Sequence, residues 1–165
     1  MSSIAFAILA AVAAQRLVEL AWARRNTIRL KARGAVEVGA RHYPLIVLLH
    51  LTWLAAILFF LPRPTVIYAV PLALFVALQF CRIWILATLG PYFTTRIVTL
   101  PGAALVRTGP YRFVRHPNYV VVAGEILSLP LAFGEPLVAL LFTLLNAAML
   151  YWRIRVEEVA LAPRR

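Results

Sequence analysis

The sequence is poor in acidic residues, lysine and cysteine. Its 165 residues include 17 basic side chains, only one of them lysine, against six acidic ones, all of them glutamate. The single cysteine, Cys81, lies inside an apolar run and excludes an internal disulfide. It has no partner with which to bind a metal, and we predict no metal site.

The chain also has no polar domain, internal repeat or low-complexity tract. Its formal net charge of +11 is high enough to suggest nucleic acid, but there is no soluble domain to read a groove. In membrane proteins, basic residues gather beside anionic lipid on the cytoplasmic side. We therefore expect membrane lipid, and no nucleic acid, as the partner of this charge.

Apolar residues dominate what remains. They make up 63% of the chain, and the mean hydropathy is +0.86. A soluble domain is nearer half apolar. This composition predicts an all-α, multi-pass integral membrane protein that forms a single membrane domain over residues 1–165.

About five apolar runs are candidates to cross a bilayer, which takes about 20 residues. The first run lacks the basic start and small-residue cleavage site of a signal peptide, so we expect it to be retained. Pro71 predicts a kink in the third run. The expected spans are Ile4–Trp22, Tyr43–Leu61, Thr65–Leu89, Tyr119–Phe133 and Leu137–Trp152.

The basic residues predict the orientation of these spans. The connector 24–41 carries six of them, the loop 90–115 four and the segment from residue 153 four, whereas the two opposite turns carry only Arg63. Loops rich in basic residues stay in the cytoplasm. We therefore expect an external N-terminus, a cytoplasmic C-terminus and a functional site that faces the cytoplasm.

Ionisable residues inside the first span require an explanation. Arg16 and Glu19 are three residues apart on one helical face. Such a pair is costly within a bilayer unless it faces protein or water. We expect both to lie near the cytoplasmic end of the span and to extend to the interface.

Polar residues also gather where the second span begins. Glu37, His42 and Tyr43 are candidates to line a substrate site, and His50 follows two helical turns later. A lone histidine in a span is either a hydrogen-bonded packing residue or a ligand. Further along, two β-prone runs flank Pro101-Gly102, so residues 96–106 predict a small hairpin on the membrane surface.

Two polar clusters lie on the predicted cytoplasmic side. One includes His116 and Tyr119, and the other includes Arg153 and Glu157, which share a helix face at i, i+4. The fourth and fifth spans form a hairpin, so these clusters should be neighbours. Pro117 can begin a helix whose first N–H groups are open to an anion. The residues thus indicate a pocket for a small polar ligand, which lies beside an entry for a lipid-soluble ligand.

The motifs in these clusters resemble a known family. Gly109-Pro110-Tyr111, then Arg115-His116-Pro117-Asn118-Tyr119, and finally Arg153-x-x-x-Glu157-Glu158 are similar to the isoprenylcysteine carboxyl methyltransferase family. The resemblance covers roughly residues 90 to 161. Phospholipid methyltransferases and NADPH-dependent sterol reductases share versions of the Arg-His-Pro-x-Tyr element, and the Arg-x-x-x-Glu-Glu segment makes the match more specific.

The resemblance implies a membrane O-methyltransferase that uses S-adenosylmethionine. Residues 90–165 would form the cofactor-binding loop, hairpin and tail, and the three spans of residues 1–89 would form the substrate side. Arg153 and Glu157 would be catalytic, and Arg115 would also brace the loop. The residues implied to contact the cofactor are Tyr111, Arg115, His116, Pro117, Tyr119 and Glu158, and the substrate candidates remain Glu37, His42, Tyr43 and His50.

The resemblance leaves the methyl acceptor open. The aromatic-rich, basic tail of eukaryotic members does not follow Glu157-Glu158 here. The chain is thus similar to short bacterial members of an inner membrane, which O-methylate alkylated phenols or pyrones, while a prenylated cysteine remains an alternative. A membrane reductase that binds NADPH and a non-catalytic membrane protein are two further hypotheses. The oligomeric state, the pathway and the division of roles between Glu157 and Glu158 stay undetermined.

Overall fold

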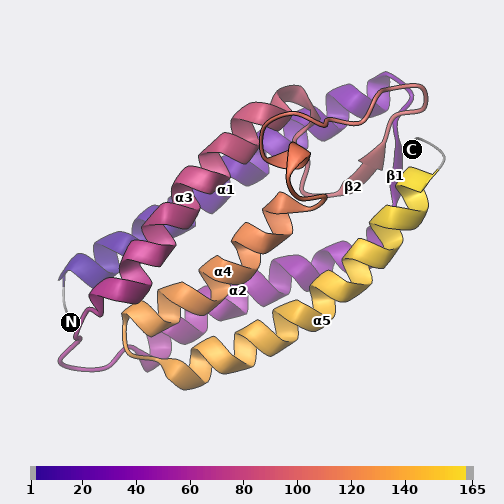
Figure 1. Ribbon diagram of the computed structural model, residues 1–165. Coiled ribbons are helices and arrows are strands. Elements are labelled where there is room, and N and C mark those ends of the chain that lie inside the picture. The colour runs from indigo at the N-terminus through magenta and orange to yellow at the C-terminus, as the bar shows by residue number, and fades with distance from the viewer. Residues whose placement is uncertain (1–2, 163–165) are drawn as a thin grey trace.

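Five helices form the body of the protein (Figure 1). The computed structural model describes residues 3–162. The helices are α1 (Ser3–Ala32), α2 (Tyr43–Phe60), α3 (Ala69–Leu89), α4 (Pro117–Ala132) and α5 (Pro136–Leu161). Between them lie two strands, β1 (Val36–Val38) and β2 (Ile97–Thr99), and three short 3₁₀ helices, η1 (Ala40–His42), η2 (Gly90–Tyr92) and η3 (Gly109–Arg112).

The predicted all-α membrane class is confirmed. Four helical segments, Ser3–Ala32, Ala40–Phe60, Ala69–Tyr92 and Pro136–Leu161, are long and apolar enough to span a membrane. The fifth, α4, has 16 residues, so it is about 24 Å long. That length is below the roughly 30 Å of a bilayer core. Arg164 and Arg165, which belong to the basic C-terminal segment, lie outside the described residues.

Several helix boundaries differ from the sequence prediction, and α5 continues nine residues past Trp152 to Leu161. Helix α1 continues ten residues past Trp22 because the arginines and alanines that follow are good helix formers, and it ends before Gly34, which has a φ of 91°. Helix α3 begins at Ala69, so Pro71 lies in its first turn and does not kink it.

The predicted surface hairpin is wrong in its pairing. Residues Ile97–Thr99 do form a strand, but β2 pairs antiparallel with β1, with Glu37 opposite Val98. The run after Pro101-Gly102 stays irregular, because its two alanines have low strand propensity whereas Val36 and Val38 are β-branched.

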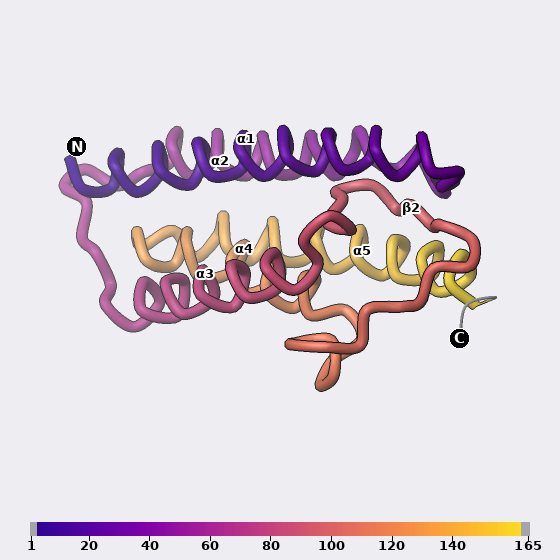
Figure 2. Tube along the Cα trace, turned by 90° about the horizontal axis from the view of Figure 1, so that it is seen from above, coloured from indigo at the N-terminus to yellow at the C-terminus, as the bar shows by residue number. Residues whose placement is uncertain are grey.

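The helices form two layers, with α1 and α2 on one side and α3, α4 and α5 on the other (Figure 2). Buried apolar side chains from all five helices pack between them, including Trp53, Ile57, Phe75, Leu129 and Phe142. The start of α1 and the α4–α5 turn lie at one end. The strands, η3 and the end of α5 lie at the other (Figure 1). The sequence motifs therefore meet at the strand end.

The α4–α5 turn buries a carboxyl group. Glu135 is 5% exposed, and neither of its carboxylate oxygens has a hydrogen-bond partner within residues 3–162. Burial raises the pKa of Glu135 to about 7 from an ordinary value of 4.5. The folded protein therefore holds this proton more tightly than the unfolded chain does.

We predict that Glu135 makes stability fall as pH rises. Its contribution is fully present below pH 4.5 and is lost as the pH approaches about 7, because the buried group must then ionise. In E135Q this loss should be absent. Thermal unfolding of both proteins in detergent across this range measures the difference, and equal pH slopes for the two would contradict the prediction.

Candidate functional site

A large cavity lies at the strand end of the bundle, and we refer to it as the larger cavity. Its volume is about 710 Å³, and its wall comes from α1, the segment 89–119 and the last turns of α5. The wall is rich in cationic side chains and contains one carboxylate, that of Glu157. The cationic residues are Arg96, Arg107, Arg112, Arg115 and Arg153. This cavity therefore suits a polar ligand with anionic groups.

A tyrosine links the two residues predicted to be catalytic. The Nε of Arg153 donates a hydrogen bond to the Tyr119 hydroxyl over 2.7 Å, and that hydroxyl donates to Oε2 of Glu157. Arg153, which is 8% exposed, also donates from Nη2 to the carbonyl oxygen of Thr95 at 2.6 Å. The i, i+4 pair is thus fixed on the cavity wall by α4, as the hairpin argument predicted.

His116 lies against this triplet. Its ring stacks on that of Tyr119, with centroids 5.4 Å apart. Its Nδ1 is 3.8 Å from Oε2 of Glu157, and its Nε2 is 3.9 Å from Oε1 of Glu158. Nη1 of Arg115 lies 3.8 Å from the same Glu158 oxygen. These distances are longer than those of hydrogen bonds, so the groups lie close together without being directly bonded.

Tyr111 and Pro117 complete the predicted cofactor residues. Tyr111 lines the larger cavity, and burial, together with the negative charge of Glu157, raises its pKa. Its hydroxyl therefore stays protonated and can donate a hydrogen bond. Pro117 begins α4 as predicted. However, the N–H groups of Tyr119 and Val120 already donate to the carbonyl of His116, so this helix start is less open to an anion than we expected.

A second, smaller cavity continues from the first toward the middle of the bundle. Its volume is about 210 Å³, and apolar residues of α1, α2, α4 and α5 make up most of its wall. The two cavities share five lining residues: Phe93, Thr94, Asn118, Tyr119 and Arg153. Ligands in the two cavities would therefore meet at Tyr119 and Arg153.

Two of the four substrate candidates line this smaller cavity, namely Tyr43 and His50. The Tyr43 hydroxyl is 3.2 Å from the Thr95 hydroxyl, and the guanidinium of Arg96 lies 4.2 Å from the centroid of the Tyr43 ring. His50 bonds through Nδ1 to the carbonyl of Ile46 at 2.8 Å. These contacts leave both aromatic rings at the cavity wall.

The other two candidates lie outside both cavity linings. His42 is buried with its ring 5.5 Å from that of Trp152. Glu37 accepts hydrogen bonds from Lys31 and Arg96. Burial opposes ionisation of Glu37, but these two cations outweigh it and lower its pKa. Glu37 therefore does not line the larger cavity itself, but it binds Arg96, which does.

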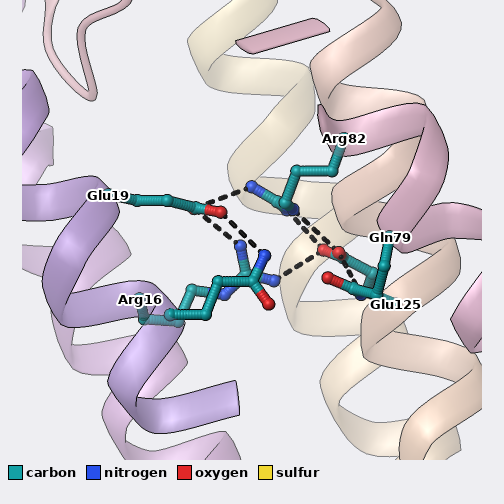
Figure 3. A network of polar contacts seen from close by, with 6 residues as sticks. Arg16, Glu19, Gln79, Arg82 and Glu125 are labelled. Carbon is teal, nitrogen blue, oxygen red and sulfur yellow. Dashed lines mark hydrogen bonds and ion pairs between the residues drawn. The ribbon is translucent and has the colours of Figure 1, made fainter. Parts of the chain in front are cut away.

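The expectation that Arg16 and Glu19 extend to the membrane interface is wrong. Both face inward at the middle of the 30-residue α1, where they join Arg82 of α3 and Glu125 of α4 (Figure 3). Gln79 completes this group on α3. We refer to Arg16, Glu19, Gln79, Arg82 and Glu125 as the buried ionic network.

Hydrogen bonds from this network, together with one from Gln15 to Oε1 of Glu19 at 2.9 Å, satisfy both carboxylates. Glu125, which is 1% exposed, accepts from Gln79 and from Arg82 Nε, both at 2.8 Å, and from Arg16 Nη2 at 2.7 Å. It also accepts from Arg82 Nη2. Glu19 accepts from Nη1 of both arginines at 3.0 Å. Sequence carried a signal for this network, since ionisable residues occur within three separate spans.

We predict that R82L strongly destabilises the fold. The substitution leaves two buried carboxylates with too little compensating charge, which costs about 3–5 kcal/mol. R25L, which removes an exposed arginine of α1, should have little effect, and the double variant R82L/E125L should recover part of the loss. Thermal unfolding in detergent tests this order, and equal midpoints for R82L and R25L would refute it.

The segment that contains most of the candidate site matches the model of a known protein family. The model of the isoprenylcysteine carboxyl methyltransferase (ICMT) family matches residues 69–163. An uncharacterized protein of Bacillus subtilis, YpbQ, is 39% identical over 158 residues, covering 93% of this chain and 94% of its own. An uncharacterized protein of Haemophilus influenzae is 25% identical over 158 residues, covering 93% and 92%. No solved structure matches the chain.

Proposed function

Because this chain belongs to the isoprenylcysteine carboxyl methyltransferase family, we propose that it is an S-adenosylmethionine-dependent O-methyltransferase for a lipophilic acceptor. The observation that carries the proposal is the shared wall of the two cavities at Tyr119 and Arg153. A polar donor and an apolar acceptor can meet there and nowhere else among the described cavities. The acceptor group is a prenylcysteine carboxylate or the hydroxyl of an alkylated phenol or pyrone.

The donor set of the larger cavity fits S-adenosylmethionine. Arginines of its wall suit the carboxylate of the methionine part, while Glu157 suits the ammonium or the sulfonium. The protonated hydroxyl of Tyr111 can donate to a polar group of the ligand, and the rings of His116 and Tyr119 offer flat surfaces. When bound, the cofactor supplies an already activated methyl group for in-line displacement.

The residues at the shared wall suit both acceptor chemistries. Arg153 can orient a carboxylate, which needs no general base. A phenol or enol must lose its proton, and Glu157 can accept it, because its carboxylate already accepts the hydrogen bond of Tyr119. Alignment in a site closed to water then provides most of the acceleration.

The smaller cavity would supply the acceptor from the lipid. Leu17 of α1 and Leu51 of α2 line it and are 68% and 61% exposed, so an apolar molecule can reach the cavity between these helices. The larger cavity would face the cytoplasm of a bacterial inner membrane, because the basic residues gather at its end of the bundle. Both cavities would then belong to a single membrane domain.

A membrane reductase is the second candidate. The observation that favours it is the set of five arginines in the larger cavity, which would suit the phosphates of NADPH. The Glu157 carboxylate on the same wall disfavours it, since a phosphate placed there would be repelled.

Ligand binding separates the two candidates. We predict that the detergent-solubilised protein binds S-adenosylhomocysteine and that NADPH does not displace it. The reason is that the Glu157 carboxylate on the cavity wall would repel the phosphates of NADPH. Isothermal titration with each compound measures this. Tight NADPH binding without a response to S-adenosylhomocysteine would overturn the methyltransferase proposal.

Substitutions at the shared wall test the proposed catalytic roles. R153A and E157Q should each lower methyl transfer by roughly 100-fold or more, whereas R155A, which removes an exposed arginine of the same helix, should not. E157Q should impair a phenol acceptor more than a prenylcysteine analogue, because only the phenol must lose a proton. Transfer of labelled methyl groups is the measurement. Unchanged turnover in both R153A and E157Q would show that Arg153 and Glu157 form only a structural contact.

A further inference from the structure

The smaller cavity has a second polar end, away from Arg153. Along α2, His50 follows Tyr43 by seven residues, and along α5, Asn146 precedes Arg153 by seven, and all four line this cavity. Seven helical residues span about 10 Å. Because α2 and α5 run in opposite directions, Tyr43 and Arg153 mark one end and His50 and Asn146 mark the other. The wall between them is apolar, with Leu49, Val122 and Met149.

Asn146 is the unexplained residue at this far end. It is 3% exposed, and its amide has no hydrogen bond to another residue within 3–162. An amide offers both donors and an acceptor, and a molecule that covers it without bonding to it leaves these groups unpaired at a cost in free energy. The side chain lines the smaller cavity. It is therefore available to a molecule that occupies the cavity.

His50 provides a complementary group. Its Nδ1 contacts the carbonyl of Ile46, and since a carbonyl oxygen only accepts, Nδ1 must carry the proton. The Nε2 of the neutral ring is then an acceptor. An acceptor on α2 and an amide on α5 together match a group that both donates and accepts a hydrogen bond, as a hydroxyl does.

The buried ionic network determines the charge of this end. Arg16, Glu19 and Arg82 also line the cavity, but two arginines are balanced by two glutamates, Glu19 and Glu125. The network has no net charge, so a full anion or cation would lack a free counter-charge there. The far end thus favours a neutral polar group over a carboxylate or an ammonium.

We propose that the acceptor carries a second, neutral hydroxyl, which Asn146 and His50 bind about two helical turns from the methylated oxygen. This inference rests on the proposed function for the identity of the near end. An entirely apolar acceptor would leave Asn146 unpaired, and a site built to bind a hydroxyl discriminates against the analogue that lacks it. Asn146 and His50 are therefore specificity-determining residues, distinct from the groups that act at Arg153.

Two phenols of equal size test the proposal. In para-(hydroxybutyl)phenol, a terminal hydroxyl replaces the methyl group of para-pentylphenol, and a ring plus a short chain bridges the two cavity ends. We expect the full-length protein in detergent to bind the hydroxylated compound at least about tenfold more tightly. Isothermal titration measures both affinities without requiring methyl transfer.

Variants then locate the effect. N146L should abolish the preference and strengthen binding of para-pentylphenol, and H50L should reduce the preference. T52V, on the exposed face of α2, where Thr52 bonds only to carbonyls of its own helix, should keep it. Retained S-adenosylhomocysteine binding in each variant shows that the larger cavity is intact.

The outcomes separate this inference from the proposed function. Equal affinity of the wild type for both phenols, binding of neither, or a preference that survives in both N146L and H50L would overturn the second hydroxyl site while leaving the methyltransferase proposal standing. Failure of the wild type to bind S-adenosylhomocysteine would instead count against the methyltransferase.

Discussion

Ionised side chains within a membrane must be paired, and the interior of this protein depends on how that is done. Two arginines and two glutamates from α1, α3 and α4 form one network with no net charge, and Gln15 and Gln79 donate further hydrogen bonds to the two carboxylates. Since α1 belongs to one layer of the bundle and α3 and α4 to the other (Figure 2), the network ties the layers together. It thereby holds the space between them in which the smaller cavity lies.

The same pairing rule operates at the shared wall, with a different result. Arg153 and Glu157 are linked through the Tyr119 hydroxyl, which lies between them and accepts from one while donating to the other. This arrangement keeps a cation and a carboxylate at one place with capacity for further partners. Around Glu125, by contrast, both carboxylate oxygens already accept hydrogen bonds, so this group has structural value but little capacity left to bind a substrate. The link through Tyr119 is better suited to chemistry.

The sequence predicted those features of the fold that depend on residues close together in the chain. The hairpin of α4 and α5 was predictable because only three residues separate two apolar runs, and it brought Tyr119 to Arg153 as expected. The buried ionic network was not predicted, because the end of the first span was placed at Trp22. With α1 extending to Ala32, Arg16 lies at mid-helix and cannot reach the interface. The pairing of β1 with β2 was also missed, since it joins strands about 60 residues apart.

The register between α2 and α5 links these observations to substrate choice. In both helices seven residues separate a group at the near end of the smaller cavity, Tyr43 or Arg153, from one at its far end, so an elongated ligand contacts a pair of groups at each end. The pairs are not equivalent. Arg153 and Tyr119 lie at the arginine-rich wall of the larger cavity, whereas Asn146 and His50 lie beside a network with no net charge. A ligand with an ionisable oxygen at one end and a neutral hydroxyl at the other would therefore bind in a single direction, and that direction places the ionisable oxygen at the wall shared with the larger cavity.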